Sequence, residues 1–134
     1  MQLTPLIAVH MTAALLALCL GPVAIWARRG SIARPQLHRA FGYAWVTVIF
    51  ITALSAIFIR DYRFPNIAGY TPIHLFVPLT LYSLFRAFYH LSQGNIAGHR
   101  IAMQRLYISA CLIAGVFTLA PNRYLGDLLW HFLR

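Results

Sequence analysis

Two histidines lie where imidazole nitrogens could bind a metal inside an apolar chain. His10 is near the start of the first long apolar segment, and His74 is near the start of the third. Ionisable residues within such segments are costly and usually functional. Histidine is a common axial ligand of haem iron, so His10 and His74 are the candidate metal ligands of one haem b. The alternative is that each ring hydrogen-bonds a neighbouring helix.

Small residues follow His10 at helical spacing. Ala13, Ala14, Ala17 and Gly21 lie on the same face of a helix as His10 and leave a stripe with little side-chain volume. A planar haem needs room of this kind. The alternative interpretation is close approach of two helices, which small residues permit in many membrane bundles.

A second group of polar residues gathers at the opposite ends of the apolar segments. No acidic residue lies at this level, and guanidinium groups without carboxylates favour an external anion or polar head group: a lipid phosphate, a haem propionate or a quinone carbonyl. A lone arginine near a helix end would instead extend its side chain to water. The candidate cofactor-binding residues of this group are His38, Arg39, Arg86, His90, His99, Arg100, Arg105 and Tyr107.

Other chemistry finds less support in the chain. His99 and Met103 share a helical face and Cys111 follows two turns later, a set that could bind copper, although methionine and cysteine are also common in packed cores. Motifs of zinc hydrolases, phosphate-binding loops and dinucleotide-binding folds are missing. The only acids are Asp61 and Asp127, which argues against carboxylate-based acid–base catalysis.

The composition places these residues in a membrane protein. Of 134 residues, 60% are hydrophobic and 10% charged, whereas an ordinary soluble domain has about 25% charged residues. The mean hydropathy is +0.69. The net charge is +9, all positive charges are arginines, and they stand between long apolar runs. Anionic lipid head groups are therefore the expected partners, and nucleic acid is not.

Four apolar stretches have the length of about 20 residues that a membrane helix needs. Short connections make consecutive helices antiparallel, so we expect one all-α domain over 1–134, an up-down four-helix transmembrane bundle. An amphipathic segment, 122–134, is expected to lie as a short helix in the interface, or else to be a loosely ordered tail. The expected spans are 5–27, 40–59, 72–91 and 101–120.

Arginines are unevenly divided between the two ends of these spans. One side carries seven arginines and no acid, whereas the other carries four arginines and both acids. The positive-inside bias then places both termini on the non-cytoplasmic side. The two sets are Arg28, Arg29, Arg34, Arg39, Arg86, Arg100 and Arg105 on the first side, and Arg60, Arg63, Arg123 and Arg134 on the second.

The two halves of the chain share a weak internal similarity. Shifting by 64 residues aligns His10 with His74, and shifting by 61 aligns His38-Arg39 with His99-Arg100. Both halves also open with Thr-Pro. The similarity suggests two helical hairpins of the same orientation, related by an axis along the membrane normal.

Two His-Arg motifs carry a family resemblance. His38-Arg39-Ala40-Phe41-Gly42 and His99-Arg100-Ile101-Ala102-Met103-Gln104-Arg105-Leu106-Tyr107, together with the early His10 and Gly21-Pro22, resemble the bacterial predicted membrane proteins of domain of unknown function 2306. The resemblance covers nearly the whole chain and implies a four-helix inner-membrane protein, without an established reaction. More loosely, histidines at two depths look like the haem-bearing cores of b-type membrane cytochromes.

Two functions therefore stand side by side. The first is a small electron-transfer module, or a subunit of a larger redox complex, with haem b between His10 and His74 and a propionate, quinone or lipid head at the Arg/His group. The second is a non-catalytic accessory or assembly subunit of a membrane complex. A transporter or a lipid-modifying enzyme is a third alternative, and four helices are few for alternating access unless the chain forms a homo-oligomer.

Overall fold

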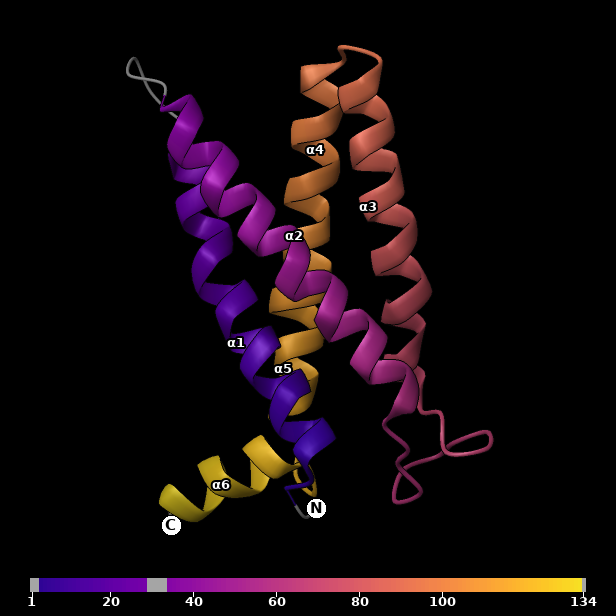
Figure 1. Cartoon of the computed structure of the whole chain (residues 1–134). Helices are drawn as coiled ribbons and strands as arrows, with labels where there is room; N and C mark the ends of the chain where they lie inside the picture. The colour runs from indigo at the N-terminus through magenta and orange to yellow at the C-terminus, as the bar shows by residue number, and fades with distance from the viewer. Residues whose placement is uncertain (1–2, 29–33, 134) are drawn as a thin grey trace.

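The computed structural model describes residues 3–28 and 34–133, and these are almost entirely helical (Figure 1). Two long helices come first, followed by a loop, and then a second pair. The elements are α1 (Pro5–Trp26), α2 (Pro35–Phe58), the 3₁₀ turn η1 (Pro72–Leu75), α3 (Phe76–Ser92), α4 (Ile96–Tyr107), the π-helical segment η2 (Ile108–Ile113), α5 (Ala114–Thr118) and α6 (Tyr124–Phe132).

Caps that are local in sequence start the two halves in the same way. Thr4 is the N-cap of α1 and accepts from the backbone N–H of Ile7 at 3.3 Å, with a proline directly after it. Thr71 caps η1 and is also followed by proline. Proline suits this first helical position because its fixed φ is helical and its missing N–H would have had no partner there. The repeated Thr-Pro is therefore a repeated helix start.

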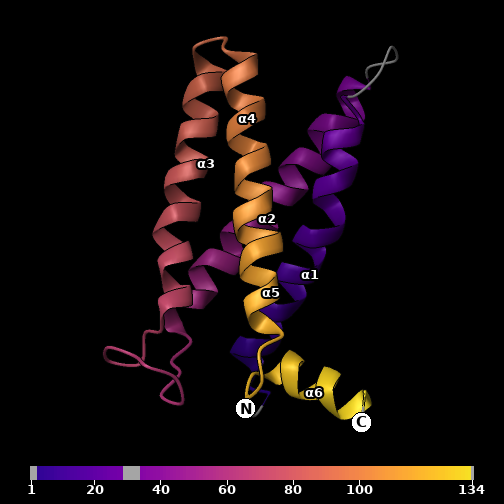
Figure 2. The same cartoon turned by 180° about the vertical axis from the view of Figure 1, so that it is seen from behind.

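The helices form two hairpins. α1 packs along α2, and α3 packs along α4; the hairpins meet where α2 contacts α3 and where α1 contacts α4 and η2. Both termini and the loop before η1 lie at the lower end in Figure 1, and the α3–α4 turn lies at the upper end. Toward that upper end the hairpins diverge, and α6 lies across the lower end, as Figure 2 shows from behind.

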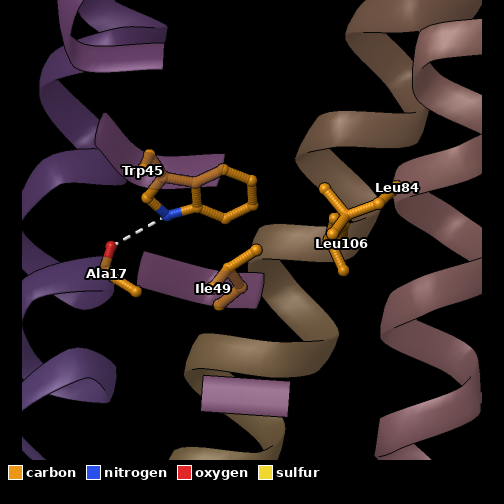
Figure 3. Packing of buried hydrophobic residues seen from close by; sticks show 5 residues of the cluster. All are labelled: Ala17, Trp45, Ile49, Leu84 and Leu106. Carbon is orange, nitrogen blue, oxygen red and sulfur yellow. Dashed lines mark hydrogen bonds between the residues drawn. The ribbon is translucent and has the colours of Figure 1, made fainter. Parts of the chain in front are cut away.

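A small core joins the hairpins near mid-length. Ala17 of α1, Trp45 and Ile49 of α2, Leu84 of α3 and Leu106 of α4 are buried together (Figure 3). The indole Nε1–H of Trp45 donates to the carbonyl of Ala17 at 2.9 Å. Few residues of the long helices are buried inside the protein, between 11% and 22% of each candidate span, as expected for helices surrounded by lipid.

Three of the four expected spans are confirmed as helices long and apolar enough to cross a membrane: Pro5–Trp26, Pro35–Phe58 and Ile96–Thr118. The third runs through α4, η2 and α5 as one rod. The expected span 72–91 begins instead as a 3₁₀ turn, and its α-helix covers Phe76–Ser92. Pro78 therefore falls in the first turn of α3, where it removes no helical hydrogen bond.

The starts of two helices differ from the expected bounds. α2 begins at Pro35 and not at 40, and α4 begins at Ile96 and not at 101. Proline supplies the first position of α2, and Asn95 caps α4 by accepting from Gly98 N–H at 2.8 Å. His38 and His99 therefore lie within the first turn of their helices. The expected C-terminal helix is present as Tyr124–Phe132; Arg29 and Arg134 lie outside the described residues.

Candidate functional site

His10 is half-buried on α1 and is bound to α2. Its Nδ1 atom lies 3.0 Å from the carbonyl oxygen of Thr52 and 3.0 Å from Oγ of Ser55. Among the described residues its Nε2 atom has no hydrogen-bond partner. An Nδ1–H that donates to a backbone carbonyl fixes the ring and leaves Nε2 available, which is the usual orientation of a metal-ligating histidine.

His74 is bound through both ring nitrogens. Its Nε2–H donates to the carbonyl of Ile59 at 2.9 Å, and its Nδ1 accepts from the backbone N–H of Thr71 at 3.1 Å. The His74 ring also lies edge-on to the ring of Tyr70, with centroids 5.1 Å apart. The guanidinium carbon of Arg60 lies 3.7 Å from the centre of the Tyr70 ring. His74 therefore fastens the loop that follows α2 to the start of α3.

The two proposed haem ligands fit that role unequally. His10 and His74 lie at the same end of the bundle, near the start of α1 and in η1. The His10 ring is oriented as an axial ligand would be, whereas the His74 ring would first have to give up its bond to Ile59. The described residues thus fit one axial ligand and do not fit a ready pair.

The stripe of small residues is filled by protein side chains and not left as room for a planar group. Ala13, Ala17 and Gly21 are buried on α1. A Cβ at Gly21 would meet the ring of Tyr107 at 2.5 Å and Nε1 of Trp45 at 3.0 Å. Around Gly21 the space is therefore occupied by aromatic rings from α2 and α4.

His38 and His99 occupy equivalent positions in the two hairpins. The Nδ1 of His38 lies 2.8 Å from the carbonyl of Ala24, and the Nδ1 of His99 lies 2.9 Å from that of Ala87. Each ring thus bonds the preceding helix of its own hairpin and is the fourth residue of its helix. This equivalence supports the proposed internal duplication.

Four arginines lie on the same helices as His38 and His99 or on the adjoining α3. Arg39, Arg86, Arg100 and Arg105, called the arginine layer below, are all exposed. Both acids of the chain lie at the lower end, in the loop after α2 and in α6. The arginine layer therefore has no carboxylate at its own level.

His90 links α3 to the start of α4 beside the arginine layer. Its Nε2 lies 3.3 Å from Arg86 Nη2, and its Nδ1 lies 3.3 Å from Asn95 Nδ2. A neutral imidazole has one acceptor nitrogen, so it accepts from only one of these two donors at a time. The ring also packs directly on Gly98, where an added Cβ would lie 2.7 Å from Nδ1.

Tyr107 has a structural partner. Its hydroxyl donates to the carbonyl of Leu18 at 3.0 Å. In a regular helix that carbonyl would accept from the residue four positions later, which is Pro22 and has no N–H. Tyr107 of α4 therefore donates to the carbonyl that proline leaves without a donor in α1. The Tyr107 hydroxyl, which was predicted to contact a cofactor, donates its proton to this carbonyl instead.

The residues considered for copper are dispersed among other contacts. His99 bonds the carbonyl of Ala87, whereas Met103 and Cys111 pack against the buried core. Within residues 3–28 and 34–133, no group of three or more His, Cys, Asp and Glu side chains could hold a metal ion.

Sequence reasoning missed two features at the lower end. Asp61 is buried; its Oδ1 accepts from the backbone N–H of Arg63 at 3.0 Å, and its Oδ2 has no hydrogen-bond partner among the described residues. Beside the same loop, a cavity of about 520 Å³ is lined by apolar residues together with Thr71 and Arg123. The signal for the cavity was weak, because its aromatic walls come from segments that are distant in sequence.

Comparison with known proteins gives the family and no function. No curated protein and no solved structure matches the chain significantly. A family model described as "Predicted membrane protein (DUF2306)" matches residues 7–123, which includes both His-Arg motifs, most of α1 and the helices from α2 to α5. The chain therefore belongs to this family of predicted membrane proteins.

Proposed function

We propose that the protein is a non-catalytic accessory subunit of a larger membrane complex, and that its arginine layer binds anionic lipid head groups. The observation that carries this proposal is the separation of charge: Arg39, Arg86, Arg100 and Arg105 are exposed at one end, while both acids lie at the other. Guanidinium groups without internal carboxylates pair readily with phosphate.

The packing supports the same function. The core that joins the two hairpins is small, and most residues of each candidate span are not buried within the chain. The candidate histidines hold helices and a loop together through backbone carbonyls. With the positive-inside rule, we infer that the layer faces the cytoplasmic side of a bacterial inner membrane. Anionic lipids attract juxtamembrane arginines there by about 1 kcal/mol each.

The double variant Arg100→Gln/Arg105→Gln tests lipid binding at this layer. We expect the wild-type protein to have a higher Tm in nanodiscs of phosphatidylglycerol than in phosphatidylcholine, and the variant to lose most of that difference. Arg60→Gln, at the opposite end, removes one positive charge and is expected to keep the difference. Equal lipid dependence of wild type and double variant would contradict the proposal.

Membership of a complex needs a separate measurement. Wild-type protein extracted from its native membrane in polymer-bounded discs is expected to migrate on native gels at a mass well above that of the 15.2 kDa chain and its disc. Migration as a monomer or as a homo-oligomer alone would overturn the accessory-subunit proposal.

A second candidate function is an electron-transfer module, which the orientation of His10 favours. Its Nδ1 is held by Thr52 while Nε2 has no partner among the described residues. Haem b would supply one-electron chemistry there, and a propionate or a quinone head would lie at the arginine layer. The bond between His74 and Ile59 argues against this function.

The absorption spectrum of detergent-purified protein decides this second candidate. A haem module is expected to show a Soret band that shifts on dithionite reduction, with sharp α and β bands, and a pyridine haemochrome assay would give its stoichiometry. His10→Ala should abolish the bands, and the control Met11→Ala should retain them. A colourless, folded protein overturns the haem proposal.

A further inference from the structure

A cavity of about 520 Å³ opens at the lower end of the molecule, within the range of pockets that hold small ligands. It lies between the start of α3, the end of α5 and the loop before η1. Phe64 and Pro65 of that loop, Phe76 and Leu79 of α3, and Phe117 of α5 line it. The rings of Phe76 and Phe117 lie 6.4 Å apart across the junction of these two helices.

Arg123 is the charged residue of this lining. Its guanidinium carbon lies 4.9 Å from the centre of the Phe64 ring, so the cation covers one aromatic wall. A second guanidinium is anchored nearby, because Nη1 of Arg63 lies 3.4 Å from the carbonyl of Asn122. One carboxylate is also near, since Asp127 Oδ1 accepts from the backbone N–H of Asn122 at 2.7 Å. The two guanidinium groups outnumber it, so the charge beside this otherwise apolar cavity is net positive.

The remaining polar side chain of the lining is already engaged. Thr71 is buried, its backbone N–H donates to Nδ1 of His74, and its Oγ1 lies 3.3 Å from the same nitrogen. Apart from Arg123, the lining thus offers few hydrogen bonds to a ligand. The matching ligand has a long apolar body and one anionic group.

We propose that this cavity binds one acyl chain of an anionic phospholipid, with the phosphate at Arg123. The cavity lies where α3 begins and α5 ends, which is the level at which the ends of spanning helices meet phospholipid head groups. An arginine–phosphate pair is charge-assisted, and the aromatic walls take the chain. A head group without an ammonium is favoured, because a choline cation would neutralise the phosphate and would be repelled by the guanidinium. This site is distinct from the arginine layer at the opposite end.

Native mass spectrometry of the full chain tests the site, with phosphatidylglycerol as the probe. We expect one retained lipid in the wild type. Leu79→Trp fills the cavity and should abolish that binding. The control is Leu112→Trp, because the side chains of Leu79 and Leu112 are both 44% exposed, and it should preserve lipid binding. Arg123→Gln should weaken binding about tenfold, and the charge-matched Arg28→Gln should not.

Several results would overturn the proposal. Leu79→Trp could retain the lipid as the wild type does. Phosphatidylcholine could bind as tightly as phosphatidylglycerol, with Arg123→Gln unchanged, which would indicate a neutral amphiphile. A dimer lost in Leu79→Trp would make a second copy of the chain the occupant. Arg100→Gln/Arg105→Gln should leave the retained lipid in place, so this test fails or succeeds independently of the arginine layer.

Discussion

Replacing Gly21 by alanine is expected to lower the free energy of unfolding by about 2 kcal/mol, through overpacking and loss of hydrogen bonds. The new Cβ would lie 2.5 Å from two ring atoms of Tyr107 and 3.0 Å from Nε1 of Trp45. Both side chains are held by bonds to α1, at the carbonyls of Leu18 and Ala17. Moving either ring away from α1 therefore breaks a bond to a carbonyl that has no water to replace it.

A matched control separates this clash from the general effect of alanine in a helix. Gly42 and Gly115 are also helical, and a Cβ at either would meet nothing within 4 Å. Alanine there is expected to be neutral or to stabilise the protein by up to about 1 kcal/mol, from helix propensity alone. The measurement is SDS-induced unfolding in mixed micelles, followed by tryptophan fluorescence. If all three variants unfold alike, the proposed packing of Tyr107 and Trp45 on Gly21 is wrong.

The positions of the helices could be predicted from the sequence, because the residues that determine them are neighbours in the chain. Apolar runs of membrane length predicted α1, α2 and the rod from Ile96 to Thr118. Thr-Pro at 4–5 and at 71–72 marks two real helix starts. A local signal also explains why α2 begins at Pro35 and not at the expected residue 40. The expected span followed hydropathy and not the proline that allows the helix to begin earlier.

The contacts of the candidate site could not be predicted in the same way. Histidine in an apolar segment indicates that a polar partner exists, but the partner can be a metal or a carbonyl of another helix. His74 illustrates this ambiguity, because its partner Ile59 lies in the segment between α2 and the loop, and only the fold brings the two together. Tyr107 is similar: its acceptor is created by Pro22, 85 positions earlier in the chain.

Leu106→Ala is expected to destabilise the protein by about 2 kcal/mol, the lower end of the range for buried leucine. Leu106 is 0% exposed and lies in the core with Trp45 and Ile49 of α2 and Leu84 of α3 (Figure 3). It is therefore central to the cluster through which the two hairpins meet. Truncating it leaves a cavity among side chains from several helices, and the lost contacts are not replaced.

The low end of the range follows from the surroundings of the helices. In a water-soluble protein, truncating a buried leucine also loses the free energy gained by removing that side chain from water. Lipid chains are as apolar as leucine, so this hydrophobic contribution is missing between helices in a membrane. Only packing is lost at Leu106. Leu112→Ala, at a residue 44% exposed on η2, removes lipid contacts that other lipid atoms restore, so we expect a change below about 0.5 kcal/mol. SDS-induced unfolding of both variants measures the difference, and equal destabilisation would show that the hairpins are not joined through Leu106.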